Sequence, residues 1–504
     1  MYSGILFIYI GYIFTLDIFS AILNTVSLLF LALETFFLFD MNQNKINSKK
    51  EGYKDLDKSD PYTPKVSIHI PVCKEPPEVV RETLRALSQL DYPNYEVCVI
   101  VNNTTENELV TPVYEECKRL GNKFRFFHLP KIEGYKAGAL NFALSITDKD
   151  AELIAVVDSD YVVSKDFLKK AVQYFKDPQV AIVQLPQDYR DFPSTPWFEG
   201  MYYAYRYFFS IVMNSCNRYN AASFMGTMGV VRRKYLEEVG GWCKEVITED
   251  SELGMRIHAK GYKSIYIDES YGKGFMPFDF YSYKKQRFRW AFGNMQTLKK
   301  NIALLFSKHL TWQQKLCYLG SNTIWFNNLL LPFLWSILCL TFNLPDKFIK
   351  GIVSCYISFL TTKFVAFVII FPKVFGISKL KGFWALLSFL SITFPMSTAW
   401  LLCLIKSKAT FWKTPKAIKV NNIKILNYLK QAKTELLILL VSFGIIIVGV
   451  VQLNIWIVLI GMINFFIYSP CIWALVEFSK FHKRKKEIKD EDRNYFSSLE
   501  ACTS

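Results

Sequence analysis

Hydrophobic and polar residues follow two different patterns along this chain of 504 residues. From residue 60 to about 280, the apolar residues come in short strand-like runs, which are Val66–Ile70, Val97–Val101, Phe124–His128, Leu153–Val157 and Val180–Gln184. Between the first two runs, the apolar residues of Glu78–Leu90 follow helical spacing. Strand, helix and strand at intervals of roughly 30 residues are typical of βαβ units, so residues 60–280 are predicted to form one α/β domain with a largely parallel sheet.

Long apolar segments lie on both sides of this domain. Residues Tyr2–Met41 are almost wholly apolar, and one span is predicted near Ile18–Leu38 because about 20 apolar residues cross a bilayer. After Tyr281, the segment Lys284–Leu305 mixes basic, aromatic and apolar residues, which predicts a position along the membrane surface. Further spans are predicted at Cys317–Leu340, Phe383–Ile405, Leu436–Val451 and Trp456–Val476.

The apolar segment Gly351–Phe371 does not fit a simple count of spans. As a fifth full crossing it would put the Lys-rich loop 406–433 outside the cell, against the preference of basic loops for the cytoplasmic side. Lys363 lies in its middle, and Pro372 is predicted to end it. We therefore expect this segment to be half-inserted or to lie on the outer face.

Composition and charge favour a membrane-anchored protein over a nucleic-acid-binding one. The chain is 51% hydrophobic with a mean hydropathy of +0.16, as expected for a membrane anchor joined to a soluble domain. The net charge of +16 would suit nucleic acid, but the basic runs at 45–50, 406–433 and 480–486 adjoin apolar segments. Such runs are typical of cytoplasmic juxtamembrane loops, so no nucleic acid is expected as a partner. The 11 Cys show no metal-binding spacing and are predicted to be free thiols of a reducing compartment.

Two acidic segments are candidates for chemistry. Asp158-Ser159-Asp160 follows the strand Leu153–Val157 directly, at the edge where parallel sheets bind ligands, and its oxygens suit Mg²⁺ or Mn²⁺. The alternative is ordinary turn chemistry. Thr248-Glu249-Asp250 precedes a predicted helix, so it is either a helix cap or the place of a general base, Asp250, that takes the proton of an acceptor hydroxyl.

Three basic segments can each be interpreted either as part of a binding site or as ordinary structure. Gly134–Asn141 combines glycines that allow close backbone approach with one cation, Lys136, or it is only a helix entry. Gln286–Trp290 offers two Arg forks for a diphosphate and an indole face for a sugar ring, although Arg and Trp are also common at membrane interfaces. Phe411–Lys416 alone reads as a basic juxtamembrane loop.

In their order along the chain, these segments resemble the processive family-2 glycosyltransferases, the family of cellulose, chitin and hyaluronan synthases. The resemblance runs from about Val66 to Lys416 and rests on an ordered set of segments: Ile70–Glu75, Gly134–Asn141, Asp158/Asp160, Gly226–Gly229, Thr248–Asp250, Gln286–Trp290 and Thr414–Lys416. It implies a cytosolic, Rossmann-like glycosyltransferase-A domain inserted between transmembrane helices.

The resemblance also implies roles for single residues. Asp158 and Asp160 would hold Mg²⁺ or Mn²⁺, and Thr248, Glu249 and Asp250 would form the catalytic segment with Asp250 as base. The nucleotide and its diphosphate would be bound by Glu75, Asn102, Lys136, Asp158, Gln286, Arg287, Arg289, Thr414 and Lys416. The acceptor sugar would lie against Gly226, Thr227 and Trp290. The domains implied are 1–41 (transmembrane), 60–280 (catalytic), 281–312 (interfacial), 313–476 (transmembrane channel with a gating loop at 406–433) and 477–504 (cytosolic tail).

Within the family, the segments Ile68–Pro71, Leu90–Asn94 and Gly226–Met228 look most like bacterial synthases of β-1,3-containing glucans. This implies UDP-glucose as donor, a β-1,3- or mixed β-1,3/1,4-glucan as product and a multi-pass protein of the plasma membrane. Val101 departs from the family, which usually has Asp there to hold the uracil, and Cys73 stands where an aromatic residue is frequent. A cellulose synthase and a non-processive enzyme making a membrane glycolipid remain alternatives, and a homo-oligomer is left open.

Overall fold

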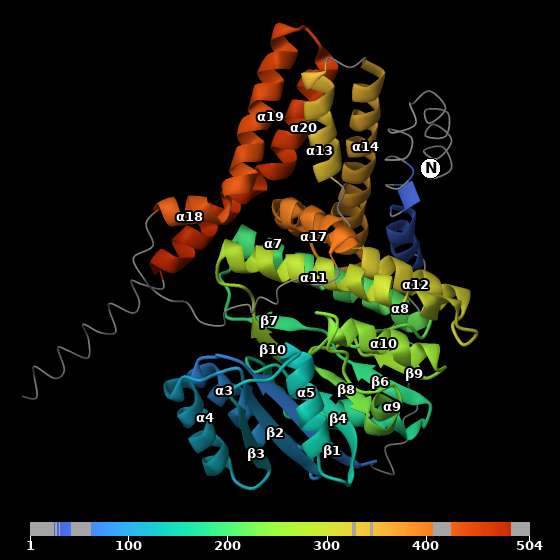
Figure 1. Ribbon diagram of the computed structural model, residues 1–504, viewed down its shortest axis with the longest axis vertical. Helices are drawn as coiled ribbons and strands as arrows, with labels where there is room; N and C mark the ends of the chain where they lie inside the picture. The colour runs from blue at the N-terminus through green and yellow to red at the C-terminus, as the bar shows by residue number, and fades with distance from the viewer. Residues whose placement is uncertain are drawn as a thin grey trace, which may run out of the picture.

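The computed structural model describes residues 25, 28–29, 31–41, 62–324, 329–342, 346–406 and 425–484. Figure 1 shows a sheet-containing domain at the bottom, long upright helices at the top, and a set of helices lying across the molecule between them. The first part comes from the middle of the chain and the second mostly from its C-terminal third, in agreement with the two sequence patterns.

The central sheet has seven strands in the order β3-β2-β1-β4-β8-β6-β9. Their bounds are β1 (Lys65–Val72), β2 (Tyr95–Asn102), β3 (Phe124–Leu129), β4 (Ala151–Val156), β6 (Val180–Gln184), β8 (Gly229–Arg232) and β9 (Lys263–Tyr266). Only β8 runs against its neighbours β4 and β6. The predicted α/β class and all five predicted strands are confirmed, whereas β8 and β9, with four residues each, had not been predicted.

Helices cover the sheet and explain why its strands are so apolar. Every residue of β2 is buried, as expected for a parallel strand with both faces covered. The helices of this domain are α3 (Pro77–Ser88), α4 (Asn107–Leu120), α5 (Tyr135–Ile146), α6 (Phe167–Val172) with η1 (Gln173–Lys176), α9 (Arg233–Glu238) and α10 (Glu249–Ala259). A small second sheet joins β5 (Val162–Val163), β10 (Gly272–Phe275) and β7 (Asp188–Arg190).

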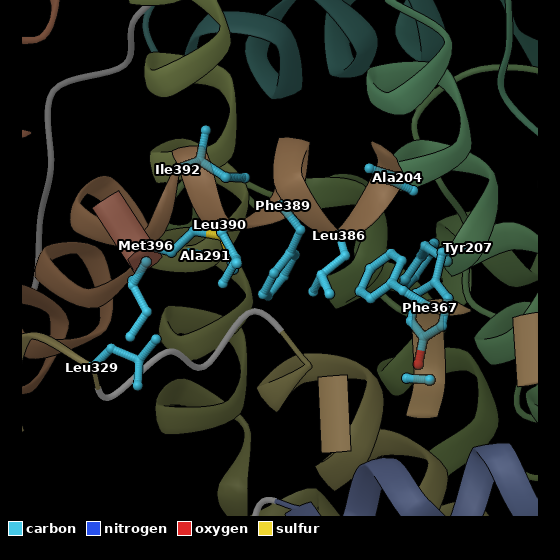
Figure 2. Close-up of a cluster of buried hydrophobic side chains, with 14 of the residues drawn as sticks. Ala204, Tyr207, Ala291, Leu329, Phe367, Leu386, Phe389, Leu390, Ile392 and Met396 are labelled. Carbon is cyan, nitrogen blue, oxygen red and sulfur yellow. The ribbon is translucent and has the colours of Figure 1, made fainter. Parts of the chain in front are cut away.

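Two long helices connect the sheet domain to the upper helices. Helix α7 (Pro196–Tyr207) packs against α16 (Lys379–Ser391), and Gly200 allows this approach because a Cβ there would lie 2.6 Å from the Trp384 carbonyl oxygen. Helix α11 (Phe280–Lys300) packs against α17 (Thr393–Ile405). Figure 2 shows the buried cluster at this junction, with Ala204 from α7 and Ala291 from α11 among its members. Large apolar side chains of the upper helices therefore bury the small residues of α7 and α11.

The remaining helices complete the junction and the upper part. At the junction lie η2 (Phe208–Met213), α8 (Asn214–Arg218), η3 (Ile302–Phe306) and α12 (Trp312–Thr323). The upper part contains α13 (Leu330–Thr341), α14 (Asp346–Phe364), η4 (Val365–Ile370), α15 (Phe371–Phe375), α18 (Ile425–Gln431), α19 (Lys433–Val451) and α20 (Ile455–Tyr468).

Among the described residues, three helices are long and apolar enough to cross a membrane: Phe348–Phe375, Lys433–Val451 and Ile455–Arg484. The last two contain the predicted spans Leu436–Val451 and Trp456–Val476. The predicted span Cys317–Leu340 is divided between α12 and α13, with residues 325–328 outside the described part.

Two predicted apolar segments differ in helix geometry from the expectation. Gly351–Phe371 belongs to one helix of 28 residues that is long and apolar enough to cross a membrane, and this helix continues past Pro372 to Phe375, so the prediction that Pro372 ends it is wrong. Phe383–Ile405 is not one straight span, because α16 and α17 meet at an angle of 49°. The polar residue Lys363 is accommodated inside the protein, where its Nζ lies 2.6 Å from Glu34 Oε2 and both side chains are buried.

Candidate functional site

A cavity of about 650 Å³ lies at the carboxyl ends of β1, β2 and β4. This is the edge at which parallel sheets bind ligands, because the loops that follow the strands converge there. Twelve residues that the sequence singled out line it: Glu75, Asn102, Lys136, Asp158, Asp160, Gly226, Thr248, Glu249, Asp250, Gln286, Arg289 and Trp290. The fold thus gathers residues that are up to 215 positions apart in the chain into one space.

The two aspartates after β4 are held in different ways. The backbone N–H of Asp158 donates to Thr227 Oγ1 over 3.0 Å, and its carboxylate accepts from Lys136 Nζ over 2.6 Å. Asp160 is fully buried, and its Oδ2 accepts from the backbone N–H of Phe275 over 2.9 Å. Thr227 therefore contributes by orienting the Asp158 backbone and is not among the residues that line the cavity.

Lys136 lies in the first turn of α5 and bridges two loops. Gly134, with a φ of +84°, caps this helix in the left-handed region that glycine favours. The Lys136 Nζ donates to the Gly226 carbonyl over 2.8 Å as well as to Asp158. Burial acts to lower the pKa of Lys136, but the carboxylates around it, Asp158 first among them, raise the pKa by more. The ammonium group is therefore charged at neutral pH.

Glu249 and Asp250 begin helix α10, and Thr248 is its N-cap residue, although its side chain makes no capping hydrogen bond. The Thr248 hydroxyl lies 3.3 Å from that of Thr297 on α11 instead. Burial, and then the charge of Asp250, raise the pKa of Glu249 to about 7. Burial also raises the pKa of Asp250 above its ordinary value, against the opposing effect of Lys136. Two adjacent carboxylates beside a cavity with raised pKa values suit proton transfer near neutral pH.

Gly226 lies directly beside Asp250. Its φ is +77°, and a Cβ at this position would collide with the Asp250 carboxylate. The glycine therefore serves two needs, a left-handed backbone and room for the carboxylate. This contact brings Gly226, which the sequence resemblance linked to the acceptor, next to the predicted base.

Helix α11 presents Gln286, Arg289 and Trp290 to the cavity. These residues are three and four positions apart, so they share one face of the helix. Arg287 directly follows Gln286, so on the helix its side chain leaves in a different direction, and it does not line the cavity. Its guanidinium carbon lies 3.9 Å from the centroid of the Tyr205 ring instead.

Several residues of the site carried no sequence signal. Tyr189 in β7, Phe275 at the end of β10 and Gln187 directly before β7 line the cavity. They belong to no compact motif, and only the three-stranded sheet brings them to Asp160. Thr414 and Lys416 lie outside the described residues.

The charges of the cavity bear on whether a divalent cation fits. Six acidic residues line it, against four basic ones: Glu75, Glu133, Asp158, Asp160, Glu249 and Asp250, with Lys74, Lys131, Lys136 and Arg289. Nowhere in the described part of the chain do three His, Cys, Asp or Glu side chains gather as a complete metal site. The Asp158/Asp160 pair nevertheless fits Mg²⁺ or Mn²⁺, because such ions commonly take one or two protein carboxylates and the phosphates of a substrate.

Comparison with known proteins gives three findings. The model of the family "Glycosyl transferase family group 2" matches residues 153–475. A cellulose synthase catalytic subunit [UDP-forming] of Pseudomonas fluorescens (strain SBW25) is 30% identical over 277 residues, which are 53% of this chain and 36% of that protein. The chain therefore matches little more than a third of this relative's length.

The third finding is structural. A mannosyltransferase from Pyrobaculum calidifontis, solved with GDP-Man and Mn²⁺, superposes with a TM-score of 0.52 at 18% identity. The match covers 76% of this chain and 99% of the other. At this level of identity the likeness concerns the fold, and it agrees with the glycosyltransferase-A class expected from the sequence.

The contact between α11 and Thr248 generates a stability prediction. Gly→Ala within a helix normally stabilises a protein by about 0.4–1 kcal/mol. At Gly293, however, the new methyl group would collide with the buried Thr248 side chain, so we expect Gly293→Ala to destabilise by about 1–3 kcal/mol. Gly444→Ala in α19, where no atom lies within 4 Å of the new Cβ, is the control and should be neutral or stabilising. Unfolding followed in detergent measures both; equal effects would contradict the packing argument.

Proposed function

Because this chain belongs to glycosyl transferase family group 2, we propose that it transfers glucose from UDP-glucose, with inversion, to a growing β-glucan at a membrane. The observation that carries the proposal is the composition of this cavity. Its lining contains the adjacent carboxylates of Glu249 and Asp250, the cations Lys136 and Arg289, and the indole of Trp290. The helix that bears Arg289 and Trp290 packs directly on α17, beneath the long apolar helices of the upper part.

In the proposed reaction, Asp250 takes the proton of the acceptor hydroxyl. The bond between that oxygen and the anomeric carbon forms as the bond from the anomeric carbon to the diphosphate breaks, and UDP leaves. Lys136 and Arg289 stabilise the negative charge of the leaving diphosphate, which in a site that excludes water is expected to be a large catalytic contribution. Burial raises the pKa of Asp250 above its ordinary value, which makes its carboxylate a stronger base than an exposed one.

We propose Asp158 and Asp160 as the protein ligands of Mg²⁺ or Mn²⁺. When bound, the ion supplies positive charge to the donor diphosphate. The excess of carboxylates over cations in the cavity supports this, since a diphosphate would otherwise enter a space that is already net negative. The mannosyltransferase of similar fold was solved with Mn²⁺.

The acceptor is proposed to lie on Trp290, because a flat indole face holds sugar rings without selecting their hydroxyl groups. For the product, the resemblance of Gly226–Met228 favours a β-1,3- or mixed β-1,3/1,4-glucan. The matched cellulose synthase subunit favours a second candidate, a β-1,4-glucan. A glycolipid product is less well supported, since Trp290 lines the cavity and three of the described helices are long and apolar enough to cross a membrane, as export of a polymer would require.

We propose that the protein is a multi-pass protein of the plasma membrane with its catalytic domain in the cytosol. If α14 crosses and the bent pair α16–α17 stays at the junction, the Lys-rich loop 406–433 lies on the same side as the sheet domain. That arrangement agrees with the preference of Lys and Arg for cytoplasmic loops. The span count from the sequence met the same preference in another way, by treating Gly351–Phe371 as a segment that does not cross the membrane fully.

Removal of divalent cations should abolish transfer. EDTA is expected to stop UDP release from UDP-glucose, and added Mg²⁺ or Mn²⁺ should restore it, because the carboxylate-rich cavity needs a cation to accept the diphosphate. Asp160→Asn should not be restored by the same additions. A coupled UDP-release assay measures each case, and full activity of Asp160→Asn would remove the metal assignment.

Asp250→Asn should block chemistry and leave donor binding. Loss of a general base costs about 10²–10⁴ in rate, while the amide keeps the size of the carboxylate beside Gly226. Turnover and UDP affinity are measured on the same sample. A variant that turns over normally, or that loses only UDP affinity, would show that Asp250 is not the base.

The product should be a β-glucan. Purified protein incubated with UDP-glucose and metal is expected to form a polymer that a β-1,3-glucanase shortens. Digestion by a β-1,4-glucanase alone would identify the second candidate, a cellulose synthase. A lipid-soluble product carrying a single sugar would overturn the assignment to polymer synthesis.

The membrane topology makes opposite predictions for two introduced cysteines. In a background without native cysteines, Leu453→Cys in the turn between α19 and α20 should react with an impermeant maleimide on intact cells. Lys379→Cys at the start of α16 should react only after the membrane is permeabilised. The reverse pattern would place the catalytic domain outside the cytosol.

A further inference from the structure

The two arginines of the Gln286–Trp290 segment occupy different surroundings. Arg289 lines the cavity and is half-buried. Arg287 is 2% exposed and lies among aromatic rings, with its guanidinium carbon 3.9 Å from the ring centroid of Tyr205, 5.3 Å from that of Tyr283 and 5.1 Å from that of Trp290. A diphosphate in the cavity would meet Arg289 and not Arg287.

Tyr205 connects three parts of this region from outside the segment. It lies on α7, is 1% exposed, and its hydroxyl donates to the side-chain oxygen of Gln286. Its ring meets the Trp290 ring edge-on, at 5.7 Å between centroids and 80° between planes. It also packs at 4.7 Å against Tyr189, which lines the cavity. One buried side chain therefore contacts Gln286, Arg287 and Trp290.

We propose that Tyr205 and Arg287 are positioning residues that set the tilt of the Trp290 ring and the direction of the Gln286 amide, and that Arg289 alone of the two arginines acts on the diphosphate. The inference rests on the proposed function and assigns a different role to Arg287 from the one that the sequence resemblance implied. A planar guanidinium stacks on an aromatic face in a way that a Lys ammonium does not reproduce. The role therefore requires the shape of Arg287 in addition to its charge.

The same geometry gives α7 a function. Since α7 packs against α16, the position of Tyr205 depends on the contact between the sheet domain and the upper helices. The plane on which the acceptor sugar would lie is thereby fixed relative to the part of the protein that faces the membrane. A misplacement of about 1 Å at a reacting group costs on the order of 10² in rate, so the consequence of loosening this contact is measurable.

The test compares Arg287→Met, Arg287→Lys and Tyr205→Leu with two reference variants, Trp290→Ala and Arg289→Met. For each, the KM for UDP-glucose, the UDP released and the labelled polymer formed are measured on the same sample. We expect the first three variants to resemble Trp290→Ala. The amount of polymer formed per UDP released should fall by about 10-fold or more, on the scale expected for misplaced reacting groups. The KM for UDP-glucose should change by less than about 3-fold. Arg289→Met should instead raise the donor KM and lower both products together.

Two results would overturn the proposal. If Arg287→Met behaves as Arg289→Met does, or if Arg287→Lys restores wild-type polymer yield, Arg287 acts through its charge on the diphosphate.

Tyr205→Phe, which removes only the hydroxyl bond to Gln286, replaces Tyr205→Leu if the latter does not fold. It should lower polymer yield as well, by a smaller factor.

Failure of the proposed function gives a separate result, because wild-type protein would then release no UDP from UDP-glucose. In that case the quenching of tryptophan fluorescence by cellohexaose and by laminarihexaose decides the positioning role. Arg287→Met should weaken this binding as Trp290→Ala does, and Arg289→Met should not. If Arg287→Met binds these oligosaccharides as tightly as the wild-type protein does, the positioning role of Arg287 is wrong, even though no turnover is measured.

Discussion

Helix α11 is packed on two opposite faces, and the arrangement of the site depends on both contacts. One face presents Gln286, Arg289 and Trp290 to the cavity. The other lies in the buried cluster of the junction, where Ala291 is 1% exposed (Figure 2). Near the start of the helix, Lys284 Nζ donates to the buried carboxylate of Glu435 on α19 over 2.7 Å. A buried carboxylate that loses such a partner is strongly destabilising, so the helix has one favourable position.

The charge arrangement of the cavity follows from this constraint. With α11 fixed, Arg289 acts on the pKa values of Glu249 and Asp250, lowering both, while burial raises them by more. Lys136 contributes to the same balance through its contacts with Asp158 and the Gly226 carbonyl. Burial thus raises the pKa values of Glu249 and Asp250 by more than the two cations lower them, and such opposed shifts are typical of functional sites.

The sequence predicted the parts of the molecule that depend on local patterns. Strand β4 and the aspartates after it follow from a buried apolar run with a turn at its end, and Asp158 lies at the cavity as expected. Strand β8 was missed because four residues give too short a run for periodicity to reveal. The sequence resemblance assigned Arg287 to the diphosphate, whereas in the structure this residue is not among those that line the cavity and lies against the rings of Tyr205 and Trp290.

The two apolar segments whose helices differ from the expected geometry have a common physical cause. Hydropathy reports that a segment is apolar, but it does not report whether lipid or protein covers it. Phe383–Ile405 is apolar because α16 and α17 bury α7 and α11, and Gly351–Phe371 contains Lys363 because Glu34, distant in sequence, neutralises it. Both facts depend on contacts between remote parts of the chain. Tyr205 carried no signal for the same reason.

The central claim is that this cavity extends one acceptor chain repeatedly beside the membrane. The most direct measurement is the size distribution of the labelled product from UDP-glucose at low conversion, with the acceptor in large excess over the protein. We expect a few long chains among acceptors that remain unextended, if Trp290 holds the chain between transfers as proposed. An even distribution in which most acceptors gain one sugar would contradict it.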